Sequence, residues 1–552
     1  MKFTRSLRWL VCCFALAPCV QAAEAPFQTF NIPMRDGIRL ATDVYLPSTN
    51  GAFPVVLLRS PYSKEAGHGI GQAGVKGGYA MVIQDTRGRF ASEGANLPFA
   101  TDGWADGHRD GADTVDWIAK QSWCNGKIST FGGSALGITQ LQLAGSGTDK
   151  LTCQHITVGA PNLYDVIYRG GVFRKSMIED WLNATKFSPE ALSIWTSHSR
   201  YDDYWRARDV SLHYAQINTP AVHIGGYFDI FAQSTIDAFN GYQLEGGPGA
   251  RGKQKLLMGP WTHGVLAAKA GDLTFPKGNR PPNNVQDQNR WWEFYLKGIS
   301  NGIDKLPAVT YYVMGDVNDP QAPGNVWRTA DKWPPVTTTT TAYYLSANKT
   351  LSTDRRSAGE PLTYSYDPSN PVPTAGGYQL TIPAGPRDQK IVEQRPDVLI
   401  FTSAPLADAI EVTGRVTIEL FASSDSPDTD FVARLCDVYP DGKSFNICEG
   451  IIRARFRETF EKEKLLEPGR VYPFKIDLWS TSIVFNKGHQ LRVHITSSSA
   501  PGYDPNPNTG EPFRSSNRTR VAKNTIYCAG DNSSRILLPV VDHGTARQSG
   551  RF

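Results

Sequence analysis

The feature that most constrains this chain is a glycine-rich turn around Ser134. Residues 127–131 have the pattern of a buried strand and residues from 135 onward that of a helix, with only Gly132 and Gly133 before the serine. So tight a strand–turn–helix leaves little room for side chains and holds the serine strained and facing solvent, as a nucleophile requires. The second glycine of the usual G-x-S-x-G pattern comes one position late, at Gly137. A simple tight turn beside a strand therefore stays an alternative.

Apolar runs alternate with helical patterns on both sides of this turn. Residues 54–58 and 79–83 are short continuous runs typical of strands buried on both faces, and residues 110–121 have helical spacing. Strand patterns return at 220–226 and 255–259. This alternation predicts an α/β fold with a mostly parallel sheet, whose chemistry lies at the carboxyl ends of the strands.

Changes in composition divide the chain into five parts. The 161–219 stretch is rich in Trp, Tyr, Arg and Asp and is helical without strand patterns, which predicts a cap inserted between core strands. Beyond residue 320, period-two runs separated by turn residues predict an antiparallel sandwich or jelly roll. The predicted parts are a signal peptide (1–22), the core in two segments (23–160 and 220–320), a helical cap (161–219) and a β-domain (321–552).

The N-terminus has the layout of a secretory signal peptide. Lys2, Arg5 and Arg8 precede an apolar run at 9–17, and small residues before Ala23 predict cleavage after Ala22. Removal of the three cations lowers the formal net charge from +4 to +1, so no nucleic-acid partner is expected. No other apolar run is long enough to span a bilayer, which predicts a soluble periplasmic or secreted protein.

The cysteines give a weaker signal. Five of the eight remain after the signal peptide: Cys124, Cys153, Cys436, Cys448 and Cys528. There is no C-x-x-C or H-E-x-x-H motif, so we expect no metal site. Export permits disulfides, and Cys436 and Cys448 flank a hairpin turn signal, so we expect a Cys436–Cys448 bond and, on weaker grounds, a Cys124–Cys153 bond.

A serine nucleophile needs a base and a carboxylate that orients the base. His263 and Asp229 each follow directly on a predicted core strand, so both lie at the edge of the sheet where Ser134 lies. Their order along the chain, Ser…Asp…His, is that of α/β-hydrolases. We predict Ser134, Asp229 and His263 as a catalytic triad. A surface-loop histidine and a helix-capping aspartate are the alternatives for the last two.

The oxyanion of a tetrahedral intermediate needs hydrogen-bond donors. The backbone N–H of Ala135, next after the nucleophile, is one candidate. The hydroxyl of Tyr62, in the loop after the 54–58 strand, is another, although from position alone it is more simply a packed loop aromatic.

Five segments together resemble the cocaine esterase/X-Pro dipeptidyl peptidase family, the CocE/NonD hydrolases, which also holds α-amino acid ester hydrolases and glutaryl cephalosporin acylases. The resemblance spans nearly the whole mature chain and implies an α/β-hydrolase core, a helical cap and a C-terminal jelly roll. It implies Ser134, Asp229 and His263 as the triad, favours Tyr62 as an oxyanion donor and makes residues 85–88 a bracing loop. The segments are 59–62, 84–94, 131–137, 201–205 and 259–263.

Departures from one branch of that family narrow the substrate. α-Amino acid ester hydrolases carry carboxylates after the triad aspartate and early in the cap, whereas here Phe231 lies close after Asp229 and Arg169 lies in the cap segment. An ammonium would be repelled by Arg169, so we hypothesise a neutral or anionic acyl group. Its predicted contacts are Phe231, Tyr168, Phe173 and Arg169. A solvated or salt-bridged Arg169 is the alternative.

These residues predict a secreted serine hydrolase, most simply a carboxylesterase, that acts on a small ester or amide through an acyl-serine intermediate. A cephalosporin or glutaryl acylase, or an X-Pro dipeptidyl peptidase-type amidase, is the first alternative. A non-catalytic secreted binding protein on the same scaffold is the second. No cofactor is expected, and formation of a homo-oligomer is left open.

Overall fold

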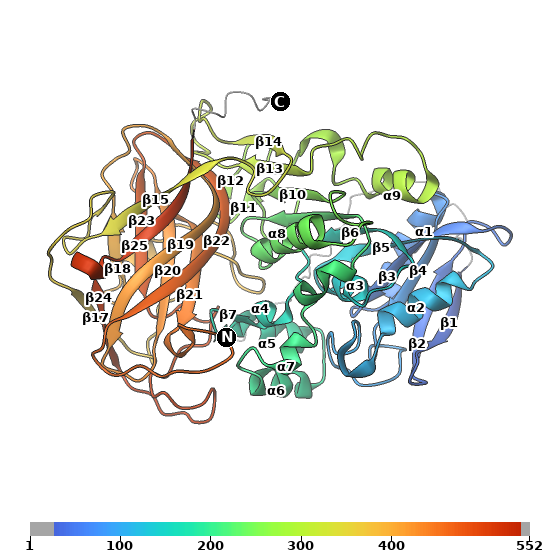
Figure 1. Cartoon of the computed structure of the whole chain (residues 1–552), viewed down its shortest axis with the longest axis horizontal. Coiled ribbons are helices and arrows are strands. Elements are labelled where there is room, and N and C mark those ends of the chain that lie inside the picture. Colours follow the sequence, from blue (N-terminus) through green and yellow to red (C-terminus); the bar gives the residue numbers. More distant parts are fainter. Residues whose placement is uncertain (1–26, 543–552) are drawn as a thin grey trace, which may run out of the picture.

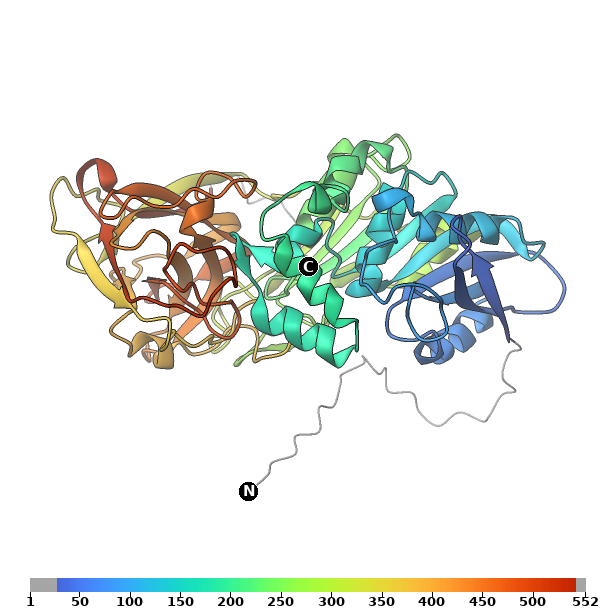
Figure 2. The same ribbon diagram turned by 90° about the horizontal axis from the view of Figure 1, so that it is seen from below.

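The computed structural model describes residues 27–542 and contains three parts arranged side by side (Figure 1). The α/β core lies at one end and the C-terminal β-domain at the other. The cap lies between them, beneath the carboxyl edge of the core sheet in Figure 1 and in front of it in Figure 2. The predicted fold class, an α/β-hydrolase core with a cap and a β tail, is confirmed. The signal-peptide prediction lies outside the described residues.

One ten-stranded sheet organises the core. Its order is β1-β2-β4-β3-β5-β6-β9-β10-β13-β14, and the strands from β4 to β13 are parallel. β14 pairs with β13, so the sheet continues past residue 320, where we expected the core to end. The strands are β1 (Phe27–Pro33), β2 (Arg39–Tyr45), β3 (Phe53–Ser60), β4 (Ala80–Asp85), β5 (Cys124–Gly133), β6 (Leu151–Thr157), β9 (Ala221–Gly226), β10 (Lys255–Gly259), β13 (Val309–Val313) and β14 (Val326–Ala330).

Helices cover both faces of this sheet because its strands are apolar on both sides. In β3, Val56 and Leu58 pack in the cluster that contains α1 and α9, whereas Val55 and Leu57 pack with α2 and α3. This explains the continuous apolar run seen in the sequence. The helices are α1 (His68–Lys76), α2 (Asp110–Ala119), α3 (Ala135–Gly145), α8 (Ala232–Asn240) and α9 (Gln288–Lys297).

The cap is less regular than predicted. A short hairpin, formed by the two-residue strands β7 and β8, interrupts its helices. Residues 204–214 do not form one continuous helix, because Asp209 accepts a hydrogen bond from the Ser211 N–H at 2.9 Å and starts a new 3-10 turn. The elements are α4 (Leu163–Ile167), β7 (Tyr168–Arg169), β8 (Val172–Phe173), α5 (Lys175–Ala184), α6 (Pro189–Ser197), α7 (Asp203–Arg206) and the 3-10 helix η3 (Val210–Gln216).

Two antiparallel sheets form the β-domain. The larger has the order β16-β15-β25-β19-β24-β17, with β22 also paired to β19, and the smaller is β18-β23-β20-β21. Alternating residues of the long strands, such as Val416, Ile418 and Leu420, are buried as the period-two pattern predicted. The strands are β15 (Thr338–Leu345), β16 (Leu351–Ser352), β17 (Leu362–Tyr366), β18 (Leu399–Thr402), β19 (Ile410–Ser424), β20 (Asp430–Val438), β21 (Ser444–Arg453), β22 (Tyr472–Phe485), β23 (Gln490–Thr496), β24 (Ala522–Tyr527) and β25 (Arg535–Val541).

Both disulfide predictions are wrong, since all five cysteines of the described residues are free thiols. β20 and β21 do form the predicted hairpin, but a register shift puts Cys436 opposite Asn446 and Cys448 opposite Leu435. The neighbours Leu435 and Cys436 point to opposite faces, so the two sulfurs do not meet. Cys153 pairs with Ser129, five residues along β5 from Cys124.

Candidate active site

The turn at Ser134 has the strained geometry that its sequence indicated. Ser134 has φ 60° and ψ −122°, and Gly132 before it has φ 139°. A Cβ on Gly132 would lie 2.6 Å from Cβ of Leu136, and one on Gly137 would lie 3.0 Å from Cα of Gly159. The late glycine is thus the point where α3 crosses the backbone that follows β6. Leu136, directly before Gly137, can keep its large side chain because that side chain packs over Gly132.

The structure brings Ser134, Asp229 and His263 together in one hydrogen-bonded chain. His263 Nε2 lies 2.8 Å from Ser134 Oγ, and its Nδ1 lies 2.6 Å from Oδ2 of Asp229. The other carboxylate oxygen, Oδ1, accepts the backbone N–H of Phe231 at 2.7 Å. Asp229 is fully buried, whereas the His263 side chain keeps 19% of its surface exposed. This is the arrangement in which a histidine can take a proton from a serine hydroxyl.

The loops that carry Asp229 and His263 are tied to each other. The Phe228 N–H donates to the Trp261 carbonyl at 2.9 Å, and the Trp261 indole donates to the Gly278 carbonyl at 2.9 Å. A Cβ on Gly226 would lie 2.3 Å from that Trp261 carbonyl oxygen, so the close approach requires glycine. His263 and Asp229 are therefore fixed by backbone packing at the ends of β9 and β10.

Two hydrogen-bond donors lie beside Ser134. Ala135 begins α3, so its N–H has no acceptor within the helix. The Tyr62 hydroxyl interacts with Ser134 and accepts the indole N–H of Trp181 at 3.0 Å. Burial raises the pKa of Tyr62, which keeps the hydroxyl protonated and able to donate.

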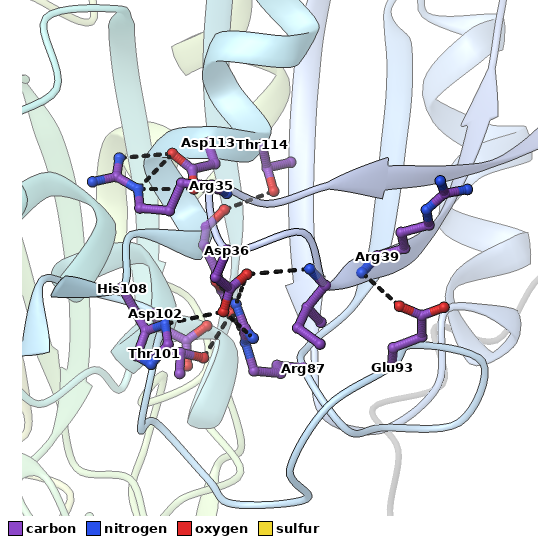
Figure 3. Close-up of polar contacts among 12 residues, drawn as sticks. Arg35, Asp36, Arg39, Arg87, Glu93, Thr101, Asp102, His108, Asp113 and Thr114 are labelled. Atoms are coloured by element: carbon purple, nitrogen blue, oxygen red, sulfur yellow. Dashed lines mark hydrogen bonds and ion pairs between the residues drawn. The ribbon is translucent and has the colours of Figure 1, made fainter. Parts of the chain in front are cut away.

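The loop after β4 connects the site to the edge of the core. Arg87 forms ion pairs with Asp36 at 2.7 Å and Asp110 at 2.6 Å, and His108 lies 3.3 Å from the same Asp36 carboxylate. Figure 3 shows Asp36, in the β1–β2 turn, at the centre of these contacts. Every partner of Arg87 is a carboxylate of the scaffold, as expected for a bracing loop.

A pocket opens beside Ser134 and is lined almost entirely by apolar side chains. The cap supplies Val166, Ile167, Met177, Ile178, Trp181 and Trp195. The rest of the lining comes from Tyr62, Phe99, Ala135, Ile138, Ile230, Phe231 and Leu380. None of these side chains, all from the described part of the chain, carries a charge. An apolar lining with a few polar groups at one end is typical of sites for small organic groups.

Phe231 lies where the sequence predicted, and its ring lies edge-on to His263 with the centroids 5.7 Å apart. The other three predicted substrate contacts, Arg169, Tyr168 and Phe173, do not line this pocket. The Arg169 guanidinium lies over the rings of Trp479 at 3.7 Å and Tyr378 at 4.6 Å, buried between the cap and the β-domain. Arg169 does not line the pocket, it is buried, and no carboxylate of the described residues forms an ion pair with it.

Tyr168 and Phe173 pack in the same interface, away from the pocket. The Tyr168 hydroxyl donates to the Trp195 carbonyl at 2.9 Å, and both rings contact Phe513 of the β-domain. Tyr168 of β7 lies directly opposite Phe173 of β8 in this hairpin, so both side chains face the β-domain. Without the tail's position, the sequence could not separate these aromatics from those of the pocket.

Several site residues were missed. Met177, Ile178 and Trp181 recur at helical spacing on one face of α5, which the periodicity alone could have identified as a face turned inward. Leu380 comes from a loop between β17 and α10 (Lys390–Glu393), far along the chain, and no sequence signal marks it.

Arg174 joins all three parts of the molecule at this site. Its guanidinium donates to the carbonyls of Ile230 at 3.1 Å and Tyr378 at 3.3 Å, so it connects the start of α5 with the Asp229 loop and the β-domain. It is buried without an ion-pair contact to a carboxylate among the described residues, and burial lowers its pKa to about 10.

Residues 27–542 contain no group of three or more His, Cys, Asp or Glu side chains that could hold a metal ion. In the same part of the chain, no helix has the length and apolarity to cross a bilayer.

Comparison with known proteins agrees with this geometry. The family model for X-Pro dipeptidyl-peptidase (S15 family) matches residues 36–191 and 181–265, and that for the X-Pro dipeptidyl-peptidase C-terminal non-catalytic domain matches residues 301–537. The chain is 33% identical to the cocaine esterase of Rhodococcus sp. (strain MB1 Bresler), over 92% of this chain and 97% of that one.

Solved structures share the whole architecture. An α-amino acid ester hydrolase superposes with a TM-score of 0.76 at 25% identity, covering 95% of this chain and 98% of that one. An aminopeptidase from a marine sediment Thaumarchaeota archaeon superposes with a TM-score of 0.80 at 24% identity, covering 96% and 98%, which bears on the fold alone. This chain belongs to the CocE/NonD hydrolase family, the esterases and S15-type peptidases built on an α/β-hydrolase core with a cap and a C-terminal β-domain.

Proposed function

We propose that this protein is a serine carboxylesterase that cleaves small esters with an uncharged, apolar acyl group. The observation that carries the proposal is the hydrogen-bonded chain from Asp229 through His263 to Ser134, which ends at the mouth of the apolar pocket. Cocaine esterase, the relative at 33% identity, is an esterase by name, which supports the ester over the amide.

In the proposed acylation step, Ser134 Oγ attacks the ester carbonyl carbon while His263 Nε2 takes the hydroxyl proton. Asp229 holds the Nδ1–H of His263 and stabilises the imidazolium that forms. Negative charge develops on the carbonyl oxygen, where the Ala135 N–H and the Tyr62 hydroxyl donate hydrogen bonds.

The intermediate then collapses to an acyl-enzyme, and water hydrolyses that acyl-enzyme in a second step. His263 returns its proton to the departing alkoxide, which leaves as an alcohol and gives an acyl-serine ester. Water attacks this ester, with His263 as the base, and releases the carboxylic acid and free Ser134. The partly exposed edge of the His263 ring gives water a path to the acyl group.

The pocket lining supports a neutral acyl group. A buried charge without a partner is costly, and the lining offers neither a cation for a glutaryl or succinyl carboxylate nor a carboxylate for an α-ammonium. Arg169, the cation that we expected for an anionic acyl group, is held by the rings of Tyr378 and Trp479. Of the two acyl groups that the sequence suggested, neutral and anionic, we therefore propose only the neutral one.

Hydrolysis of p-nitrophenyl esters tests the proposal. We expect p-nitrophenyl butyrate to be cleaved at least about a hundredfold faster, by kcat/KM, than the monosuccinate ester or an α-amino ester, as the cost of an unpaired buried charge requires. Ser134→Ala should remove the activity, and the matched Ser129→Ala, at a buried serine of strand β5, which leads into Ser134, should keep it. Activity that survives Ser134→Ala contradicts the mechanism.

The same panel separates the alternatives. Faster cleavage of X-Pro p-nitroanilides, or of glutaryl amides, identifies an amidase or acylase. No turnover of any substrate by a folded protein favours the non-catalytic binding protein. Each of these results replaces the carboxylesterase assignment.

We further propose export, on the basis of the N-terminal segment alone. The prediction is cleavage after Ala22, which gives a mature chain that starts at Ala23. Mass spectrometry of protein recovered from the periplasm or medium of an expressing bacterium measures the N-terminus directly. An uncleaved chain retained in the cytoplasm contradicts this localisation.

A further inference from the structure

The candidate oxyanion donor is in contact with the cap. Trp181 lies on cap helix α5, only 9% exposed, and its indole N–H donates to the Tyr62 hydroxyl oxygen at 3.0 Å. Tyr62 itself belongs to the core loop after β3 and interacts with Ser134, with which it lines the same pocket. One cap side chain thus reaches the group that lies next to the nucleophile.

The direction of this hydrogen bond determines where the phenolic proton points. A tyrosine hydroxyl has a single proton, and an indole N–H can only donate, so the oxygen of Tyr62 must be the acceptor from Trp181. The Tyr62 proton is then directed away from Trp181, toward Ser134 and the space beside it. A hydroxyl that accepts one hydrogen bond is also polarised into a better donor for the next.

The ring of Trp181 is held so that its N–H cannot turn elsewhere. It lies parallel to Phe99 at 5.8 Å with an interplanar angle of 1°, and parallel to Trp195 at 6.4 Å with an angle of 4°. Trp195 lines the same pocket, but its indole bonds to Tyr204 instead. The stack therefore contains two similar indoles, and only one of them bonds to Tyr62.

We propose that Trp181 is a positioning residue for the reaction: its N–H orients the Tyr62 hydroxyl as an oxyanion donor, so that part of the oxyanion hole is set by the cap. This inference rests on the proposed hydrolase function. It assigns to Trp181 a role separate from the apolar contact that its ring makes with the acyl group.

A double-mutant cycle on Tyr62 and Trp181 tests the proposal with p-nitrophenyl butyrate. Tyr62→Phe should lower kcat about a hundredfold, as the loss of one oxyanion donor does. Trp181→Phe, which keeps an aromatic ring and removes the N–H, should lower kcat about tenfold with KM changed less than about threefold. In the Tyr62→Phe background, Trp181→Phe should change kcat by less than about twofold, because its target is already absent.

Trp195→Phe is the matched control, since its effect should be the same in both backgrounds. A trifluoromethyl ketone with a propyl chain gives a second readout. It forms a serine hemiketal whose oxyanion needs the hole, so Trp181→Phe should weaken it about tenfold, while the corresponding alcohol, which forms no oxyanion, should bind unchanged. A merely structural role would weaken both ligands alike.

Equal effects of Trp181→Phe in both backgrounds, or no effect on kcat, overturn the inference. If Trp181→Phe does not fold, replacement of Trp181 by benzothienylalanine removes the N–H from a ring of the same shape and decides between the same outcomes. These results are distinct from failure of the proposed function, which would appear as full activity in Ser134→Ala.

Discussion

At the scale of single residues, the site depends on a few positions where only glycine fits. Gly132 has a positive φ and lies against Leu136, and this contact sets the angle at which β5 enters α3. Ser134, two residues later, has its own positive φ, so this serine is held in a conformation that few non-glycine residues adopt. The strain is maintained by the sheet and helix on either side of the turn.

This contact leads to a prediction for Gly132→Ala. Its Cβ would meet Leu136 at 2.6 Å, so we expect a loss of about 3 kcal/mol or more in stability and at least about a tenfold fall in kcat. Gly126→Ala is the matched control on the same strand, because φ is 85° there but nothing lies within 4 Å of the added Cβ. It should cost about 1 kcal/mol and leave kcat unchanged. Melting temperature and esterase assays measure both, and equal effects would contradict the prediction.

Residue roles at the sheet edge could be predicted from sequence because topology limits them. Ser134, Asp229 and His263 each follow a core strand, and parallel strands bring such positions together whatever the loops do. Arg169 could not be placed in this way. Its environment is made by Trp479 and Tyr378, hundreds of residues away, and the cap sequence contains no sign of them.

At the scale of elements, one arginine joins the loop that carries Tyr62 to the cap. The Arg89 guanidinium donates to the Pro61 carbonyl at 2.9 Å, beside Tyr62, and to the carbonyls of Thr185 and Lys186 at the end of α5, at 2.6 and 3.1 Å. These carbonyls lie where a helix leaves its last acceptors unused. The Arg89 guanidinium also lies over the Phe187 ring, 4.2 Å from its centroid.

We therefore predict that Arg89→Lys loosens the cap. A lysine ammonium cannot reach the Pro61 and α5 carbonyls at once in the fork geometry of a guanidinium. We expect kcat to fall about tenfold and limited proteolysis to cut the cap segment faster. Arg206→Lys, at an exposed pair with Asp203, is the control and should change neither. Unchanged proteolysis of Arg89→Lys would argue against this link.

At the scale of the whole molecule, the β-domain is packed into the cap through buried cations. Arg169 lies over two rings of the β-domain and donates to the Tyr503 hydroxyl at 3.2 Å and to the Glu449 carbonyl. The sequence predicted that a jelly-roll tail would follow the core, but not how it docks. That docking depends on side-chain contacts between segments that have no fixed spacing in the chain.

The corrected place of Arg169 can be tested with Arg169→Met. Loss of its contacts leaves two buried acceptors unsatisfied, so we expect a cost of about 2 kcal/mol and a melting temperature lower by a few degrees. The ratio of kcat/KM for butyrate and monosuccinate esters should stay within about twofold of the wild-type value. A marked change in that ratio would return Arg169 to the acyl site.

A buried histidine between the core and the β-domain should make stability depend on pH. His489 lies 2.8 Å from Asp437 on β20 and 3.3 Å from Asp316 in the loop after β13. Burial lowers the pKa of His489, but the bonds and charges of Asp437 and Asp316 outweigh it, so the pKa is raised above the usual 6.5. The stabilisation is then complete below pH 6.5 and is lost as the pH rises through the folded-state pKa.

His489→Gln should therefore lower the melting temperature more at pH 6 than at pH 8.5. Thermal unfolding of the wild type and the variant in matched buffers measures the difference. An equal loss at both pH values would mean that the charged form of His489 contributes nothing to the contact.

The presence of Leu380 in the pocket has a consequence for how such enzymes diversify. This residue belongs to the β-domain, outside the segments that hold Ser134, Asp229 and His263. Drift or exchange of the loop around it can reshape the acyl site while the hydrolytic groups stay as they are. Changes in the β-domain can thus alter which substrates fit the pocket while the groups at Ser134 stay the same. Two relatives with matching catalytic residues need not share a substrate.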